Sequence, residues 1–303
     1  MMLAHDAGAP APAPTRIGPT TFRWGERTFV MGILNVTPDS FSGDGLLAGG
    51  QLPSEVAAEV AVAAARRMAA EGADLLDIGG ESTRPGHDPV DIAEEIARDV
   101  PVIAAVRATL PDLPISVDTS KAAVAEAAIG AGADLLNDVW GTSPGSPMAA
   151  IAAAAGLPLV VMHNRAEPHY DRVLPEIVAD LSAAIERAVA AGVDPDRLIV
   201  DPGFGFGKTP DHNIEILRGL AGLRVLGRPV LLGTSRKSTL GRILGLPVDD
   251  RLEATLATTA LGIAAGVDIV RVHDVRANVR AARTADAVVR GTWREDDDEG
   301  GLH

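Results

Sequence analysis

Polar and charged residues of this sequence gather in eight short segments, each of which directly follows an apolar run. The segments begin at Asn35, Asp77, Asp118, Asn137, Met162, Asp201, Gly233 and Arg271. The three lysines, Lys121, Lys208 and Lys237, all lie in these segments, as do three of the five phenylalanines. Because arginine supplies the other cations, each lysine indicates a position that favours a compact ammonium. This sorting of residues predicts one functional site.

The side chains in these segments suit a flat heterocycle that carries an anionic group. Asp118, Asn137 and Asp201 offer carboxylates and an amide to the N–H groups of a ring edge. Cations that could bind the anion are also present, namely Lys237, Arg271 and His273. Backbone N–H groups of the 233–235 loop and of a helix that begins after Asp274 suit phosphate oxygens. From the residues alone, we predict a site for a heterocyclic phosphate ester.

Short apolar runs alternate with longer Ala-rich segments along the chain. The β-branched runs cover residues 29–36, 75–78, 115–117, 135–139, 159–162, 198–200, 230–232 and 269–272. Segments with helical spacing lie between them, for example at 55–70, 92–108 and 177–191. Eight strand–helix units predict an α/β fold, a single (β/α)8 TIM barrel with its site at the carboxyl ends of the strands. A doubly wound open sheet is the alternative, but no G-x-G-x-x-G loop follows the first run.

The ends of the chain differ in composition from the predicted barrel. Residues 1–19 are rich in Ala, Pro and Gly and are expected to be a disordered leader. An alternation of apolar and polar residues over 21–29 predicts a short N-terminal hairpin at the start of the barrel domain, residues 20–292. Residues 293–303 contain a run of five acidic residues and are expected to be a flexible, solvated tail.

Composition excludes several classes of protein. The chain has 303 residues and no cysteine, which rules out disulfides, thiolate catalysis and thiolate-bound metal. The formal net charge of −14 argues against nucleic acid and anionic membranes as partners. We expect a cytoplasmic protein, since no long apolar stretch and no basic–apolar leader is present.

Four blocks of the sequence resemble the dihydropteroate synthase family, a group of pterin-binding barrels that are sulfonamide targets. They are Asn35-Val-Thr-Pro-Asp-Ser-Phe-Ser42, Gly79-Gly-Glu-Ser-Thr-Arg-Pro-Gly86, Asp201-Pro-Gly-Phe-Gly-Phe-Gly-Lys208 and Gly233-Thr-Ser-Arg-Lys-Ser238. The resemblance spans residues 30–275. It implies condensation of 6-hydroxymethyl-7,8-dihydropterin pyrophosphate with p-aminobenzoate, release of pyrophosphate, Mg²⁺ as the cofactor, and a homodimer in folate biosynthesis.

The resemblance also implies roles for individual residues. Asp118, Asn137 and Asp201 are expected to bind the pterin edge, and Lys237 its carbonyl region. Met162 and Phe206 should line the faces of the ring. The pyrophosphate and its Mg²⁺ should meet Asn35, Thr83, Arg271 and His273, with Gly233 on the phosphate-binding loop. The p-aminobenzoate site should contain Thr83, Arg84, Pro85 and Ser238. Lys237, Asp201, Arg271 and His273 are the residues expected to be catalytic.

Several residues have a plainer interpretation beside the functional one. Lys121 and Lys208 are each expected to pair with a neighbouring carboxylate, and Phe204 to lie in the core. His163 either shapes its loop or contacts a ligand. Glu81 and Asp138 could orient other residues without touching a substrate.

One departure from the family pattern keeps an alternative function open. The family reads Phe-Ser-Asp-Gly-Gly after its first block, whereas this chain reads Phe41-Ser-Gly-Asp-Gly45. A non-catalytic pterin-binding paralogue could carry such a change. A methyltetrahydrofolate methyltransferase is a weaker alternative, because it would not need the intact 233–238 loop or the pair Arg271 and His273.

Overall fold

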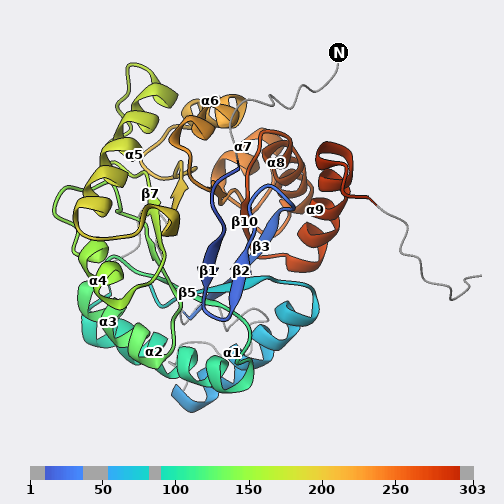
Figure 1. The fold of residues 1–303 in the computed structure, drawn as a ribbon. Helices are drawn as coiled ribbons and strands as arrows, with labels where there is room; N and C mark the ends of the chain where they lie inside the picture. The colour runs from blue at the N-terminus through green and yellow to red at the C-terminus, as the bar shows by residue number, and fades with distance from the viewer. Residues whose placement is uncertain (1–10, 37–53, 82–89, 294–303) are drawn as a thin grey trace, which may run out of the picture.

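Eight parallel strands form a barrel with the helices on its outside (Figure 1). The computed structural model describes residues 11–36, 54–81 and 90–293. The strands follow the order β8-β7-β6-β5-β4-β3-β10-β9. A bridge between Val200 and Val230, with a hydrogen bond of 2.9 Å from Val200 N to Pro229 O, joins the two ends of this sheet. The predicted (β/α)8 barrel is confirmed.

The strands and helices alternate along the described chain as expected. The barrel strands are β3 (Phe29–Asn35), β4 (Leu75–Gly79), β5 (Ile115–Asp118), β6 (Leu135–Asp138), β7 (Leu159–Met162), β8 (Leu198–Asp201), β9 (Leu231–Leu232) and β10 (Ile269–Val272). The α-helices are α1 (Ser54–Ala70), α2 (Ile92–Thr109), α3 (Ala122–Ala131), α4 (Met148–Ala155), α5 (Val173–Ala190), α6 (Pro210–Gly219), α7 (Ser238–Leu244), α8 (Leu252–Ala264) and α9 (Val275–Arg290). Two 3₁₀ helices are η2 (Pro195–Arg197) and η3 (Leu220–Leu226).

Alternation along each strand divides the apolar residues between two cores. One set points outward and packs against the helices, as do Val30, Leu76, Val117, Leu136, Val161, Val200, Leu232 and Val270. The other set fills the barrel interior near the amino ends of the strands and comprises Phe29, Met31, Leu75, Leu135, Val160, Ile199, Leu231 and Ile269. Side chains of successive strand residues point to opposite faces, so the next inward position on each strand lies one layer closer to the carboxyl ends.

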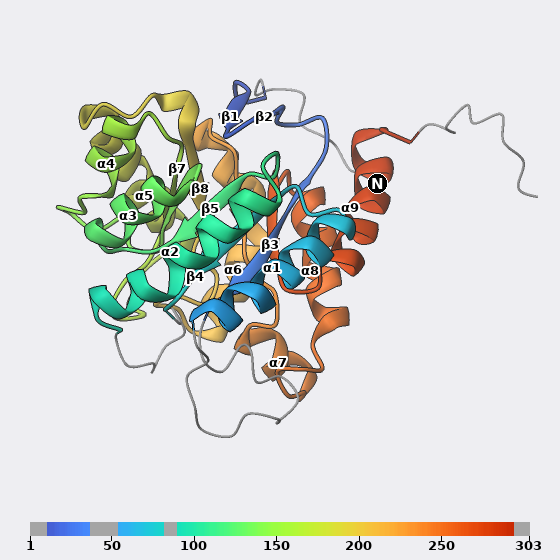
Figure 2. The same cartoon turned by 90° about the horizontal axis from the view of Figure 1, so that it is seen from below.

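A two-stranded hairpin seals the amino end of the barrel. Strands β1 (Thr15–Ile17) and β2 (Thr20–Phe22) pair antiparallel. Their residues Ile17 and Phe22, followed by Trp24, are buried in the same apolar cluster as the interior strand residues. The ring centroids of Phe22 and Phe29 lie 4.6 Å apart. In Figure 2 the hairpin lies at one end of the barrel and α7 at the other.

The hairpin begins earlier than the sequence suggested. We expected it over 21–29, yet its first strand lies inside the range assigned to the leader, so the boundary at residue 19 was placed too late. Gly18, at φ 55°, lies in the turn between the strands. Gly18 and Pro19, which fall in the range expected to be the leader, therefore form the hairpin turn. Within the described residues, no helix is long and apolar enough to cross a membrane.

The hairpin β1–β2 with Trp24 closes the amino end of the barrel as a plug, and weakening its packing should destabilise the whole barrel. Phe22 is fully buried, and Phe22→Ala is expected to lower the free energy of unfolding by about 3–5 kcal/mol, the usual cost of a large aromatic deletion in a core. Urea unfolding followed by circular dichroism would measure this. Val225→Ala is the matched control, because Val225 is 75% exposed. Equal midpoints for both variants would contradict a structural role for the hairpin.

Candidate active site

The inward residues at the carboxyl ends of the strands form a polar layer above the apolar interior. Strand register places Asp118 beside Asn137 and Met162 beside Asp201. The side chains of Asp118, Asn137 and Asp201 are buried, with at most 6% exposed. The three acceptors that the sequence assigned to the ring edge thus lie on strands of one barrel mouth.

Arg271 lies between two carboxylates in this layer. Its Nε is 2.5 Å from Asp77 Oδ2, and one of its terminal nitrogens is 2.7 Å from Asp118 Oδ2. Asn137 Nδ2 donates to the same Asp77 oxygen at 3.1 Å. Arg271 was expected on a separate cationic side facing phosphate. Its guanidinium pairs with the acidic side of the layer, because two buried carboxylates need a counter-charge, and its contact with phosphate stays a prediction.

Asp77 is a site residue that the sequence reasoning missed. It is fully buried, and it accepts from both Arg271 and Asn137. It lies two residues before Gly79, so strand alternation places both on the inward face of β4. That alternation was the available signal; from the sequence, Asp77 is named as the start of a polar segment but is assigned no role at the site.

Buried carboxylate oxygens in the layer remain open to a ligand. Asp77 Oδ1 and Asp118 Oδ1 have no hydrogen-bond partner in the described part of the chain. Burial raises the pKa of Asp118, and Asp77 adds to the rise, while Arg271 opposes it. Burial likewise raises the pKa of Asp201, while the nearby charge of Lys237 lowers it. Asp201 Oδ1 accepts a hydrogen bond from Gly203 N at 2.7 Å. Buried acceptors without partners are costly, so they favour a bound donor.

Lys237 reaches the same layer from the loop after β9. Its Nζ donates to the carbonyl of Phe204 and lies 4.4 Å from the ring centroid of Phe206. Burial lowers the pKa of Lys237 to about 7, although Asp201 opposes this shift. Gly205, at φ 87°, leaves room for the lysine, because a Cβ there would lie 2.9 Å from Lys237 Cδ. The predicted grouping of Lys237, Asp201 and Phe206 is therefore present.

The loops after β9 and β10 meet beside Lys237. Ser235 Oγ lies 3.0 Å from His273 Nδ1 and accepts from His273 N at 3.2 Å. Gly233 lies between two cations, since a Cβ there would be 3.8 Å from Arg271 Cβ and 3.9 Å from Lys237 Nζ. His273, Gly233 and Lys237 are thus close together as predicted, whereas Ser238 is exposed at the start of α7.

The remaining predicted contacts involve Asn35 and residues outside the described ranges. Asn35 ends β3 opposite Gly79 and is half-buried. Thr83, Arg84 and the loop with Asp44 lie outside the described residues. The described ranges contain no group of three or more His, Cys, Asp or Glu residues that could hold a metal ion.

Three residues near the mouth follow their plainer interpretation. Lys121 Nζ contacts Glu81 Oε2 at 2.9 Å and Glu95 Oε2 at 2.5 Å, so this lysine pairs with carboxylates as expected. Phe204 is fully buried in the core. Asp138 accepts from Trp140 N at 2.9 Å and from Ser146 Oγ at 2.8 Å, which orients its own loop.

Lys208 pairs with a histidine instead of a carboxylate. Its Nζ lies 3.0 Å from His163 Nδ1 and 2.9 Å from Phe206 O. His163 is fully buried, and burial lowers its pKa to about 4. Its Nε2 lies 3.0 Å from Asp180 Oδ2. Of the two interpretations of His163, the structure therefore supports the one in which it shapes its loop.

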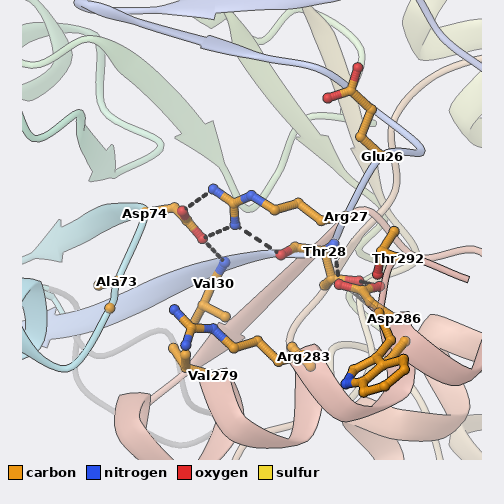
Figure 3. Close-up of a pocket in the computed structure, with 14 residues that line it drawn as sticks. Glu26, Arg27, Thr28, Val30, Ala73, Asp74, Val279, Arg283, Asp286 and Thr292 are labelled. Carbon is orange, nitrogen blue, oxygen red and sulfur yellow. Dashed lines mark hydrogen bonds and ion pairs between the residues drawn. The ribbon is translucent and has the colours of Figure 1, made fainter. Parts of the chain in front are cut away.

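A groove of about 820 Å³ lies away from this layer, next to the amino ends of β3 and β4 and against α9 (Figure 3). Several of its charged groups already have partners. Arg27 binds Asp74 through two contacts of 3.0 and 2.5 Å, and Asp286 accepts from Thr28 N at 2.7 Å. The open acceptors and the lowered lysine pKa make the mouth, not this groove, the candidate active site.

Comparison with known proteins agrees with this geometry. The family model described as pterin binding enzyme matches residues 31–273. A dihydropteroate synthase of Clostridium beijerinckii is 48% identical over 276 residues, which cover 91% of this chain and 99% of that protein. The crystal structure of a Clostridium difficile dihydropteroate synthase with pteroic acid superposes with a TM-score of 0.83 at 47% identity, covering 89% of this chain and 99% of that one.

A second solved relative is similar in extent. The Xanthomonas albilineans dihydropteroate synthase with 4-aminobenzoic acid has a TM-score of 0.82 and 42% identity, and the match covers 91% of this chain and 98% of that one. The family model spans most of the chain, and these relatives are matched almost from end to end. This chain therefore belongs to the pterin-binding enzymes and, among them, to the dihydropteroate synthase family.

Proposed function

We propose that the protein is a dihydropteroate synthase of folate biosynthesis. It joins 6-hydroxymethyl-7,8-dihydropterin pyrophosphate to p-aminobenzoate and releases pyrophosphate. The observation that carries this function is the buried layer of Asp118, Asn137 and Asp201, with Lys237 and Arg271 among them. Of the two solved relatives, one structure was determined with pteroic acid and the other with 4-aminobenzoic acid, which supports the same pair of substrates.

The pterin edge suits the acceptors of the layer. Its ring amino and amide N–H groups would donate to Asp118, Asn137 and Asp201, including the oxygen of Asp118 that has no partner among the described residues. Lys237 would donate to the pterin carbonyl, and Phe206, whose ring already faces that ammonium, would lie against the pterin face with Met162 opposite. Burying this polar edge is favourable only because each donor meets an acceptor.

The chemistry needs alignment and charge stabilisation more than a strong base. The aryl amine of p-aminobenzoate is uncharged at neutral pH. We infer a dissociative displacement without a covalent enzyme intermediate, in which the C–O bond to pyrophosphate breaks first and the amine nitrogen then forms the new C–N bond. The amine proton then passes to solvent. Positive charge that develops at the methylene spreads into the electron-rich pterin, which Asp118 and Asp201 favour. The site would supply orientation and stabilise the leaving group through His273 and Arg271.

Mg²⁺ would accompany the pyrophosphate. Asn35 ends β3 half-buried, and its side chain makes no hydrogen bond with the described part of the chain. Because Mg²⁺ keeps several waters and often takes one or two protein oxygens together with substrate phosphates, a single amide oxygen is an adequate ligand. When bound, the ion would neutralise charge on the departing pyrophosphate.

The non-catalytic paralogue is the alternative that an assay must exclude. It would bind dihydropterin pyrophosphate through the same layer, but p-aminobenzoate would not cause release of pyrophosphate. The one-position shift of Asp44 remains the only sequence feature in its favour. The methyltransferase alternative has no support in the comparisons, whose reported relatives are dihydropteroate synthases.

Asp201→Asn should lower kcat/KM for the pterin substrate by roughly tenfold to a hundredfold, because a hydrogen bond to a charged group contributes about 1.5–3 kcal/mol. Pyrophosphate release dependent on p-aminobenzoate is the measurement. Asp196→Asn is the matched control, since Asp196 is 53% exposed at the opposite end of the barrel. Wild-type protein that binds the pterin substrate without releasing pyrophosphate would contradict the synthase and favour the paralogue.

Affinity for the pterin substrate should fall as pH rises through about 7. The pKa of Lys237 is lowered to about 7, so its cation is present below that pH and lost above it. Calorimetry between pH 6 and pH 9 would show the change, and Lys237→Gln should remove it while weakening binding at low pH. A wild-type affinity that stays flat across this range would refute a charged Lys237 in binding.

We also propose that two copies associate through α7 and α8. Four apolar side chains on these helices and the loop between them are exposed, namely Ile243 at 58%, Leu244 at 45%, Val248 at 45% and Leu261 at 62%. Leu261→Asp should convert a dimer to a monomer in sedimentation velocity, whereas Val288→Asp on α9, at a residue 73% exposed, should not. A monomeric wild-type protein at micromolar concentration would disprove the dimer.

A further inference from the structure

Arg236 has an unusual backbone conformation next to the candidate catalytic lysine. Its φ is 57°, and among the described residues it is the only one other than glycine with a positive φ. Lys237 N donates to Thr234 O at 3.1 Å, so Arg236 occupies the third position of a four-residue turn. That position normally favours glycine when φ is positive. The arginine side chain must therefore offer something that glycine could not.

Neighbouring residues hold this turn from several sides. Arg236 N donates to Thr255 Oγ1 at 3.2 Å, and Arg236 O accepts from Arg251 at 2.9 Å. Both partners belong to the start of α8 and its N-cap. A strained residue persists only where its surroundings determine its conformation, and such residues concentrate at functional sites.

The guanidinium of Arg236 binds the next loop through two contacts. Arg236 Nε lies 3.0 Å from Asp274 Oδ2, and a terminal nitrogen lies 2.6 Å from Asp274 Oδ1. The pair is only partly exposed, at 35% for the arginine side chain and 25% for the aspartate. Bidentate pairing of this kind fixes orientation as well as distance. Asp274 directly follows His273, so the pair fixes the backbone that carries the histidine.

A second contact joins the same two loops. Ser235 Oγ lies 3.0 Å from His273 Nδ1. These two residues directly precede Arg236 and Asp274, which form the ion pair. The loop with Lys237 and the loop with His273 are consequently joined at two adjacent positions. Two independent loops would otherwise have to be ordered when a substrate binds, at a cost in conformational entropy.

We propose that Arg236 is a positioning residue that, through Asp274, holds the loops after β9 and β10 as one preformed wall for the pyrophosphate of the substrate. This inference rests on the proposed synthase function. Arg236 itself does not contact the reacting atoms. Its ion pair keeps His273 and the 233–235 backbone in register, so the wall is ready before the anion arrives.

The test separates the ion pair from the strained backbone. Arg236→Gly removes the side chain but allows a φ of 57° without strain. This variant should bind dihydropterin pyrophosphate roughly tenfold to a hundredfold more weakly, the range seen when supporting contacts around a site are lost. Binding of 6-hydroxymethyl-7,8-dihydropterin, which lacks pyrophosphate, should change by less than about twofold. Calorimetry with both ligands measures the difference.

Asp274→Asn and the double variant Arg236→Gly/Asp274→Asn test whether the two residues act together. If the two residues act as one unit, the double variant should be no weaker than either single variant. Arg27→Gly is the matched control, because Arg27 forms a bidentate pair with Asp74 beside the remote groove (Figure 3). It should leave both affinities unchanged. Thermal unfolding of every variant should confirm that each is folded at the assay temperature.

Two results would overturn the inference. Either Arg236→Gly binds both ligands as the wild type does, or it weakens both equally, as a purely structural change would. A wild-type protein that fails to release pyrophosphate on addition of p-aminobenzoate would instead contradict the proposed function. The two failures are therefore distinguishable.

Discussion

The guanidinium of Arg271 lies inside the barrel between the carboxylates of Asp77 and Asp118, where few water molecules could replace them as partners. Removing Arg271 would leave two buried carboxylates without a counter-charge, which typically costs about 3–5 kcal/mol. Closer to the mouth, the negative charge of Asp201 and the positive charge of Lys237 compensate one another in the same way. The polar layer is thus held together by charge compensation, and a ligand enters a framework in which Asp77 and Asp118 each keep one oxygen without a partner among the described residues.

This polar layer depends on the apolar layer beneath it. Alternation along several strands puts one large aliphatic residue and then one polar residue on the inward face, as in Leu75 and Asp77 or Ile199 and Asp201. The scarce aromatic residues are placed at the two ends, with Phe22 and Trp24 in the plug and Phe206 at the mouth. Ala-rich helices cover the outside, where small side chains allow close packing.

Local pattern was enough to predict the barrel, because short apolar runs alternate with helical segments, and to point to its mouth, because the polar residues follow those runs. It was not enough to predict partners across the barrel. Arg271 and Asp77 are 194 residues apart, and Lys208 and His163 are 45 apart, so nothing in either segment indicates its partner. The predicted position of the hairpin was too late in the sequence, because composition assigned residues up to 19 to the leader although Gly18 and Pro19 form the hairpin turn.

The plug gives the barrel interior a single opening. Ile17 and Phe22 are fully buried at the amino end, so every molecule that reaches the polar layer must enter and leave through the opposite mouth. If the pterin occupies the layer as proposed, it lies deepest, and whatever binds above it blocks its exit. Binding would then be ordered, with the pterin substrate entering before p-aminobenzoate. Release would follow the reverse order, with pyrophosphate or the aryl end of the product leaving the mouth first.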